Sequence, residues 1–298
     1  MVIPPYQPPR SRSMVGLVVA LVGVGLFVAL ILAVVFVSRA AKKAIDEIPR
    51  GSSRAEARAD ETVFNEASAD QKISVGNETT FIKTFPLGED AAFGIRNLNG
   101  SVTIETWDKP QAQVTIIKRG SDQERGAAQV YFKKDDDGLW LRTAYPRGGS
   151  NKNDVVYQIK LPRELDSVDL NTINGAIKLS DITAAITVQT VNGLLTLENV
   201  AGVRKAQSTN GNIKATISGA GSDGMEFKNV NGNIDLQIKG DLDADLDAAS
   251  VRGAITIDDQ FGVPVQKQVV GQKANGQIGT GGTPLNIKTV NGSIRLSK

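Results

Sequence analysis

The chain has 298 residues, and it contains neither cysteine nor histidine. The absence of cysteine excludes disulfides, thiolate zinc sites and cysteine nucleophiles. The absence of histidine removes the commonest general base and the commonest transition-metal ligand. The metal sites that remain plausible are oxygen-ligand sites for hard cations. Residues 1–50 carry six basic and two acidic side chains, and the total charge of +2 therefore leaves −2 for the rest of the chain, a slightly acidic body with no electrostatic footprint for nucleic acid.

The first predicted element is a transmembrane helix over residues 14–37. These 24 residues carry no charged side chain. At about 1.5 Å per residue, a helix of this length reaches roughly 36 Å, which crosses the hydrocarbon core of a bilayer and contacts membrane lipid. The alternative is a cleaved signal peptide, whose apolar region would be shorter, at about 7–15 residues. Residues 1–13 are rich in proline and are predicted to form an extended tail.

Residues 38–75 are predicted to form a juxtamembrane helix followed by a linker. Pro49 ends the helix, because proline lacks the N–H that a helix interior needs. The sequence after it is small, polar and charged, with too little apolar surface to build a core. Basic residues flank residues 14–37 on both sides, and their small excess on the C-terminal side leaves the orientation in the membrane undecided.

Residues 76–298 are predicted to form one repeat domain, because an Asn-Gly dipeptide recurs along them. From Gly175 onwards the glycines of this frame lie 16 to 23 residues apart, a period typical of repeat architectures, and Arg252-Gly253 fits the same frame. The Asn-Gly dipeptides are Asn99-Gly100, Asn174-Gly175, Asn192-Gly193, Asn210-Gly211, Asn231-Gly232, Asn275-Gly276 and Asn291-Gly292.

A strand is predicted after each of these glycines. The second residue after the glycine is aliphatic in every repeat, as at Ile177, and the fourth is aliphatic in most, as at Leu179. The residue between them is mostly polar or charged, as at Lys178. Alternation with a period of two is typical of a strand with one buried and one wet face.

The dipeptide itself is predicted to be a corner. An Asn-Gly hairpin would pair polar residues such as Thr190 with aliphatic ones across the turn. A corner in a coil lets the aliphatic residues on both sides, such as Val191 and Leu195, point inward. We expect glycine to supply a positive φ there, and the asparagine side chains to form a ladder along the stack.

The expected fold is therefore an all-β, single-chain β-solenoid, similar to a parallel β-helix, preceded by one transmembrane α-helix. Each coil is expected to stack on the previous one in sequence order, with parallel strands. The segment between the first two dipeptides alternates as strands with larger side chains, and it is predicted to be a partly antiparallel cap at the N-terminal end of the solenoid. Its aromatic residues are Trp107, Tyr131, Phe132, Trp140, Tyr145 and Tyr157.

Three features together resemble the bacterial "putative adhesin" family of β-solenoid domains. They are LNGSVTIETWD at residues 98–108, VVYQIKLP at residues 155–162 and the run of x-NG-x-I-x-L coils. The resemblance covers roughly residues 80–298. It implies a domain tethered by a single membrane helix and placed outside the cytoplasm. It implies no catalytic residues, since the family has none that are accepted.

Two groups of carboxylates are the candidates for chemistry. Asp241, Asp243, Asp245 and Asp247 alternate in sequence and would share one face of a strand, where they could bind Ca²⁺. A solvated outer face is the preferred interpretation, so no metal or cofactor is predicted. The other group is the adjacent pair of Asp258 and Asp259, which could serve a polysaccharide-cleaving enzyme. Nothing else in the sequence converges on that pair, so no catalytic residue is predicted.

The sequence therefore predicts a membrane-anchored, non-enzymatic envelope protein. Its solenoid surface would serve adhesion or scaffolding, with an envelope protein or a glycan as partner and no role for nucleic acid. One alternative is an envelope-stress or regulatory sensor whose tail, residues 1–13, contacts a cytoplasmic partner. The other alternative is a carbohydrate-active enzyme built on a β-helix.

Overall fold

The computed structural model describes residues 60–145, 154–221 and 223–298. The chain divides into two units, Met1–Lys42 and Lys43–Lys298, and all described residues belong to the second. The predicted tail at residues 1–13, the predicted transmembrane helix at 14–37 and the part of the predicted linker before residue 60 lie outside the described residues. Within the described part of the chain, no helix is long and apolar enough to cross a membrane.

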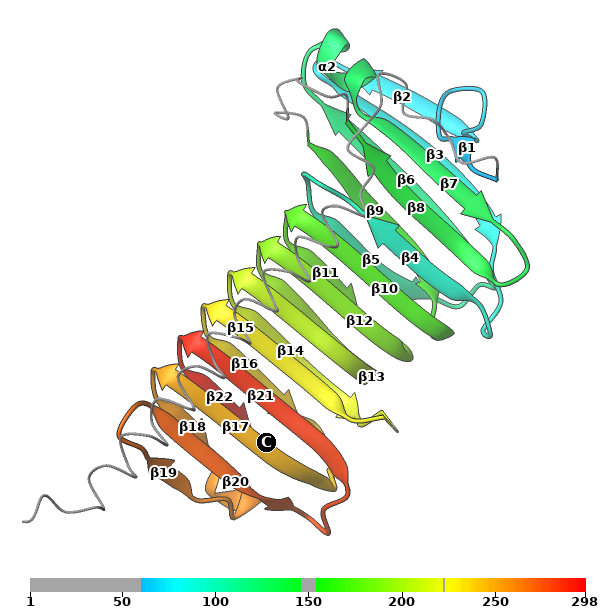
Figure 1. Ribbon diagram of the computed structural model, residues 1–298. Coiled ribbons are helices and arrows are strands. Elements are labelled where there is room, and N and C mark those ends of the chain that lie inside the picture. Colours follow the sequence, from blue (N-terminus) through cyan, green and yellow to red (C-terminus); the bar gives the residue numbers. More distant parts are fainter. Residues whose placement is uncertain (1–59, 146–153, 222) are drawn as a thin grey trace, which may run out of the picture. The chain divides into compact units, whose positions relative to one another are not determined.

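The described residues form the all-β, solenoid-like stack that the repeat predicts (Figure 1). Within the described residues, one continuous sheet of 22 strands folds into two layers. The first layer contains the long strand of each coil. Its spatial order is β1 (Thr62–Val63), β7 (Gln129–Lys134), β8 (Gly138–Ala144), β4 (Ala92–Arg96), β10 (Glu164–Asn174), β12 (Thr183–Asn192), the second half of β13 (Leu195–Asn210), β15 (Met225–Asn231), β21 (Thr283–Asn291), β17 (Ala244–Arg252), β20 (Gln272–Ile278) and β19 (Val265–Lys267).

The second layer contains the short strand of each coil and is joined to the first through β13, which bends at Asn199 and takes part in both. Asn199 adopts a φ of 54° at this bend. The spatial order of the second layer is β2 (Gln71–Val75), β3 (Glu78–Pro86), β6 (Gln111–Arg119), β9 (Val155–Pro162), β5 (Val102–Trp107), β11 (Ile177–Ser180), the first half of β13, β14 (Ile213–Gly219), β16 (Ile234–Ile238), β22 (Ile294–Ser297) and β18 (Ile255–Ile257).

Antiparallel pairs close both ends of this parallel stack. At the N-terminal end, β3 pairs antiparallel with β2 and β6, and β7 with β8, as expected for a partly antiparallel cap. A short helix, α2 (Asp122–Ala127), lies in this cap, and Ser121 and Glu124 form a capping box at its start. At the other end, a hairpin of β19 and β20 follows the 3-10 helix η1 (Asp259–Phe261) and pairs antiparallel with β17.

The hairpin at the C-terminal end corrects one predicted corner. Asn275 and Gly276 lie in the middle of β20, where they pair with Asp247 and Leu246 of β17. Asn275 Nδ2 donates to Asp247 Oδ1 at 3.0 Å. The dipeptide resembles the corners in sequence, but its chain runs straight because it extends an antiparallel edge and starts no new coil.

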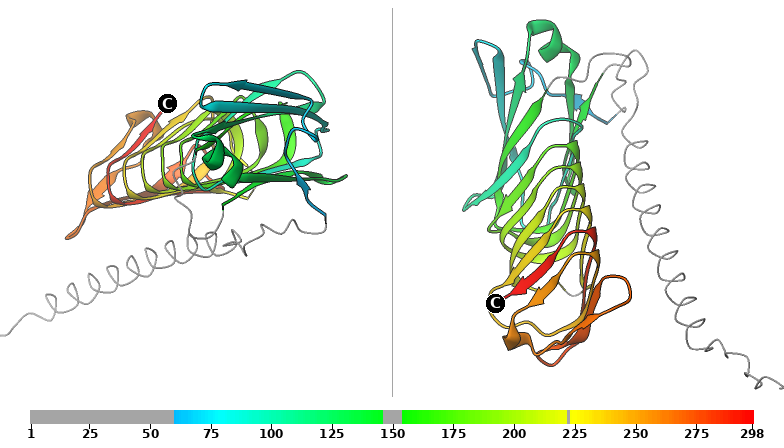
Figure 2. Two further views of the ribbon diagram at one scale, coloured as in Figure 1. Left: turned by 90° about the horizontal axis from the view of Figure 1, so that it is seen from above. Right: turned by 90° about the vertical axis from the view of Figure 1, so that its left-hand side faces the viewer.

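The order of the coils also differs from the expectation. The last coil in sequence, β21 with β22, is not at the end of the stack. It lies between the coil of β15 with β16 and the coil of β17 with β18 (Figures 1 and 2). In sequence, the coil at the end of the stack, β17 with β18, therefore comes before β21 with β22. The last two strands of the chain lie between two coils that precede them in sequence.

The interior of the stack is aliphatic, but one inward row is polar, contrary to the expectation. Thr190 is 4% exposed, whereas its neighbour Val191 is partly exposed on the outer surface. The row points inward because each side chain hydrogen-bonds to the glycine carbonyl of the adjacent coil. The donors and acceptors are Thr190 Oγ1 to Gly175 O, Ser208 Oγ to Gly193 O, Asn229 Nδ2 to Gly211 O, Thr289 Oγ1 to Gly232 O and Ser250 Oγ to Gly292 O.

Thr172 occupies the same row without such a bond. Its buried Oγ1 has no hydrogen-bond partner among the residues that the structure describes. The equivalent acceptor would be Gly100 O, which already accepts from Asn97 Nδ2 at 3.0 Å. A buried hydroxyl without a hydrogen-bond partner lowers the stability of the fold, because nothing replaces the hydrogen bonds it made to water in the unfolded chain.

We therefore expect Thr172→Val to raise the free energy of unfolding by about 1 kcal/mol, because valine has the shape of threonine without the unpaired hydroxyl. Thr190→Val is the matched control. It removes the bond to Gly175 O, which is 3.1 Å long, and should lower the free energy of unfolding by about 1 kcal/mol. Urea unfolding of both variants measures the two changes, and equal signs would contradict this account.

The corners combine an asparagine ladder with a column of glycines. Each ladder asparagine donates Nδ2 to Oδ1 of the next at 2.7–2.8 Å, in the order Asn291, Asn231, Asn210, Asn192, Asn174 and Asn99. Behind the ladder, the glycines stack closely: a Cβ on Gly193 would lie 2.0 Å from Gly175 O. Arg252 ends the ladder, whereas Gly253 continues the glycine column against Gly292 O.

The predicted positive φ is present at some corner glycines and not at others. Gly100, Gly211 and Gly232 have φ values of 112°, 150° and 155°. Gly193 and Gly175 are not among the residues with positive φ. What the corners share is the close approach of successive coils, which leaves no space for a side chain.

Candidate functional site

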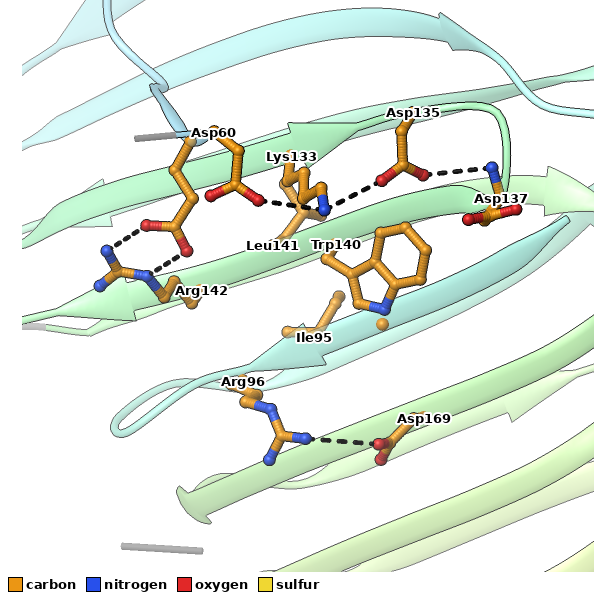
Figure 3. A pocket seen from close by; sticks show the side chains of 12 residues that line it. Asp60, Ile95, Arg96, Lys133, Asp135, Asp137, Trp140, Leu141, Arg142 and Asp169 are labelled. Carbon is orange, nitrogen blue, oxygen red and sulfur yellow. Dashed lines mark hydrogen bonds and ion pairs between the residues drawn. The ribbon is translucent and has the colours of Figure 1, made fainter. Parts of the chain in front are cut away.

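A cleft of about 390 Å³ opens on the outer face of the first layer, near its N-terminal end (Figure 3). Strands β7, β8, β4 and β10 form its floor, and the residues before β1 form one wall. Its lining is mostly charged and includes a single aromatic side chain. The lining residues are Asp60, Glu61, Gly94, Ile95, Arg96, Lys133, Asp135, Asp137, Trp140, Leu141, Arg142 and Asp169.

Trp140 lies flat on the sheet because two glycines leave room for it. A Cβ on Gly94 would lie 2.8 Å from Trp140 Cδ1, and a Cβ on Gly138 would lie 2.9 Å from Trp140 Cη2. Gly94 is the cross-strand partner of Trp140. One face of the indole therefore contacts backbone, and the side chain as a whole remains 37% exposed. The result is a fixed aromatic surface that faces the cleft.

The turn between β7 and β8 forms the wall on one side of Trp140. Asp135 Oδ1 accepts from the backbone N–H groups of Asp137 and Gly138, both at 3.1 Å, which fixes the turn. Lys133 Nζ lies 3.1 Å from Asp135 Oδ2 and 3.0 Å from Asp60 Oδ2. Burial acts to raise the pKa of Asp135, but the hydrogen bond and charge of Lys133 outweigh it, so the pKa lies below its usual value.

Arg142 forms the opposite end of the cleft. Its guanidinium donates to both carboxylate oxygens of Glu61, with Nε 2.8 Å from Oε1. The same guanidinium lies 4.2 Å from the centroid of the Tyr131 ring. The side chains of Arg142 and Glu61 are 12% and 10% exposed. Because their bidentate contact fixes both groups in one geometry, the pair provides a rigid wall.

A third charged pair lies on the side of β10. Arg96 and Asp169 approach to 3.6 Å, and Asn171 Nδ2 donates to Asp169 Oδ1 at 2.6 Å. Burial raises the pKa of Asp169 above its usual value, although Arg96 and the bond from Asn171 act against it. Arg96 is nearly half exposed and presents its donors to solvent.

The cleft has more carboxylates than basic groups. Its lining contains five acidic and three basic side chains. Within the described residues, the carboxylate of Asp137 has neither a hydrogen bond nor an ion pair, and it stands beside the indole (Figure 3). An exposed aromatic face with fixed donors and acceptors around it can hold a ring that is apolar on one face and polar at its edges.

The four aspartates proposed as a cation row do not converge. Asp241 and Asp243 precede β17, and Asp245 and Asp247 lie on it. Asp247 Oδ2 is 2.8 Å from Lys288 Nζ, Asp241 contacts Lys298, and Asp243 Oδ1 accepts from the N–H of Thr280. Among the described residues, no cluster of three acidic side chains is arranged to hold a metal.

The adjacent pair of Asp258 and Asp259 lies at the start of η1. Asp258 Oδ1 accepts from the N–H of Gln260 at 3.1 Å and caps this helix, and Asp259 is in its first turn. Neither residue lines the cleft around Trp140. Their local role is therefore the start of the connection to β19.

Sequence reasoning treated Trp140 as part of the N-terminal cap and assigned it no site. The sequence does indicate that Trp140 faces outward, because it alternates with the apolar residues Leu139 and Leu141, which are buried in the structure. An outward-facing tryptophan between two inward-facing leucines is unusual on a solvated sheet. The glycines beneath it, Gly94 and Gly138, are informative only once the pairing of β4 with β8 is known.

Comparison with known proteins gives a family but no function. A putative cell adhesion protein from Clostridium sporogenes has 15% identity and a TM-score of 0.45, with 74% of this chain and 99% of that chain covered. A putative adhesin from Bacteroides fragilis has 9% identity and a TM-score of 0.23, with 73% and 96% covered. No curated protein matches the sequence. The Toastrack DUF4097 family matches residues 58–297, and the chain therefore belongs to this family.

Proposed function

We propose that this protein is a non-enzymatic binding protein, anchored in a membrane by residues 14–37, that recognises a glycan outside the cytoplasm through the cleft around Trp140. The observation that carries the proposal is the indole laid flat over Gly94 and Gly138 in an open cleft. The C–H face of a sugar ring can pack on such an indole, while its hydroxyl groups reach charged side chains around it.

The surrounding charges define the kind of glycan. Arg96 supplies hydrogen-bond donors, and Asp137 and Asp169 supply acceptors, on either side of the indole. The excess of carboxylates disfavours a polyanionic polymer such as a polyuronic acid. The cleft therefore fits a neutral or amine-bearing sugar, and the unpaired Asp137 is the group placed to meet an amine.

The extracytoplasmic location and the membrane anchor rest on the sequence. The uncharged segment at residues 14–37 supports the anchor, and the resemblance to tethered envelope proteins supports the location. The alternative of a regulatory role for the tail concerns residues 1–13, which lie outside the described part of the chain.

Binding of full-length protein to a panel of neutral, amine-bearing and acidic polysaccharides tests the proposal. We expect Trp140→Ala to weaken binding about tenfold or more, which corresponds to the loss of about 1.4 kcal/mol. Gly94→Ala should also weaken binding while it retains the tryptophan, because the new Cβ would lie 2.8 Å from Trp140 Cδ1 and lift the indole from the sheet.

Leu194→Ala is the matched control. Leu194 is 46% exposed, similar to Trp140, but it lies at a corner and does not line the cleft. This variant should bind as the unmodified protein does. Equal binding by Trp140→Ala and the unmodified protein, or preferred binding of acidic polysaccharides, would contradict the proposal.

A further inference from the structure

The tip of the β19–β20 hairpin exposes two consecutive valines. Val269 is 85% exposed and Val270 is 59% exposed, and Val269 is the most exposed large hydrophobic side chain among the described residues. They occupy the middle of a four-residue turn that Gln268 N–H closes on Gly271 O at 3.1 Å. Glycine, asparagine and aspartate dominate such positions, because they suit the backbone of a turn and its contact with water. The stability of the fold therefore gives no reason for two β-branched apolar residues at these positions.

The hairpin belongs to a part of the chain that has no acidic residue. The 39 residues from Gln260 to Lys298 contain no Asp or Glu and five basic side chains. Lys267 is exposed at the base of the tip and has no ion-pair partner among the described residues. Arg252 is also exposed and has no ion pair among the described residues. It lies near the tip, because a Cβ on Gly271 would be 2.0 Å from Ser250 O. Three of the five basic side chains are paired, Lys273 and Lys288 with Asp247 and Lys298 with Asp241. The exposed positive charge beside the valines therefore comes from Lys267 and Arg252.

A second exposed hairpin provides the contrast. At the other end of the stack, Ile73 and Val75 of β2 are 50% and 71% exposed (Figure 1). Residues 66–78 around them contain three acidic side chains and one basic side chain. Both hairpins are apolar, but charges at the second are paired, Lys72 with Glu66 and Arg119 with Glu78. Lys267 beside the first has no ion-pair partner among the described residues.

We propose that the tip of the β19–β20 hairpin inserts into the surface of a membrane that contains anionic lipid. Apolar side chains enter the boundary between headgroups and acyl chains, while basic side chains beside them contact anionic headgroups. Two valines offer far less surface than the roughly 1,200 Å² of total area that a stable protein interface buries, so a lipid surface fits this tip better than a protein partner. The proposal does not depend on the glycan cleft.

Depth-dependent fluorescence quenching on full-length protein tests this inference. The chain contains no cysteine, so Gln268→Cys gives a single labelling site beside the valines. Asn77→Cys, in the turn after β2, is the matched control. Each labelled protein is reconstituted in vesicles of phosphatidylcholine, with and without phosphatidylglycerol, that contain a nitroxide-labelled lipid. We expect quenching at position 268 in the vesicles with phosphatidylglycerol and its absence at position 77.

Two changes separate the apolar and the electrostatic parts. Val269→Ser with Val270→Ser should abolish quenching at position 268, and Lys267→Glu should reduce it. Added salt should also reduce it, because screening shortens the reach of charge to about 10 Å at 0.1 M. Equal quenching at positions 77 and 268, no quenching at 268 with phosphatidylglycerol, or energy transfer between tips of two copies would each overturn the proposal.

Discussion

A chain that ends at Gly282 is expected to lose much more than its last coil. Deletion of a terminal coil from a solenoid normally removes one layer, because each coil contacts its neighbours alone. Here β21 and β22 lie between β15 and β17 in the first layer and between β16 and β18 in the second. Their removal would separate the end of the stack from the rest and expose two new edges.

The expected loss is comparable with the stability of a whole domain. Leu285, Ile287, Ile294 and Leu296 are each at most 1% exposed. Complete burial of one such side chain contributes about 1.5–3 kcal/mol, so the four together contribute roughly 6–12 kcal/mol. Native domains are stable by about 5–15 kcal/mol. The truncated chain should therefore unfold at its C-terminal end or altogether.

Limited proteolysis and urea unfolding of the truncated chain measure this effect. Residues 244–278 should become sensitive to protease, although none of them is deleted. Deletion of Lys298 alone is the control, since it removes one surface contact with Asp241, and such pairs contribute about 0–1 kcal/mol. Protection of residues 244–278 in the truncated chain would show that the last coil does not support them.

The sequence predicted the coils but could not predict their order. The strands after Gly232, Gly253 and Gly292 carry the same aliphatic pattern, so each is an equally good neighbour for the others. The order depends on which coil can accept the antiparallel hairpin of β19 and β20 at its outer edge. That hairpin also contains Asn275-Gly276, and its resemblance to a corner concealed the end of the repeat.

The assignment of the inner face failed for a similar reason. Hydrophobic alternation favoured Val191 as an inward residue and Thr190 as an outward one, and the structure has the reverse. The deciding contact is a hydrogen bond from Thr190 to a glycine carbonyl of the adjacent coil. Such a contact between coils is invisible in a single repeat. A buried polar group is stable when it is paired, and only the stacked structure reveals the pair.

The candidate site could be predicted in part. Alternation alone places Trp140 on the outer face, and the composition of residues 133–142 supplies the charges near it. The cleft also needs Arg96 and Asp169, which come from β4 and β10. Their position beside Trp140 follows from the parallel register of strands that are distant in sequence, and no local pattern specifies that register.

Gly193→Val is expected to lower the free energy of unfolding by more than about 3 kcal/mol. The new Cβ would lie 2.0 Å from Gly175 O, and the backbone on both sides of it is held in the stack. Overpacking of a close-packed interior costs about 1–3 kcal/mol. Displacing the corner would also weaken the bond from Gly193 N–H to Asn210 O and the ladder bonds of Asn192, each worth about 0.5–1.5 kcal/mol.

Two further glycines separate lack of space from backbone strain as the cause. Gly240 has a φ of 86° but open space where a Cβ would be, and Gly88 has open space without a positive φ. Gly88→Val should change the free energy of unfolding by about 0.5 kcal/mol or less, as surface substitutions do. Gly240→Ala should lower the free energy of unfolding by about 1 kcal/mol through backbone strain alone.

Gly193→Ala introduces no such strain, because Gly193 has no positive φ. If it lowers the free energy of unfolding more than Gly240→Ala does, the close approach of the coils is the reason for glycine. A smaller loss would mean that the coils can separate at their corners, and the glycine column would then not hold the stack in register.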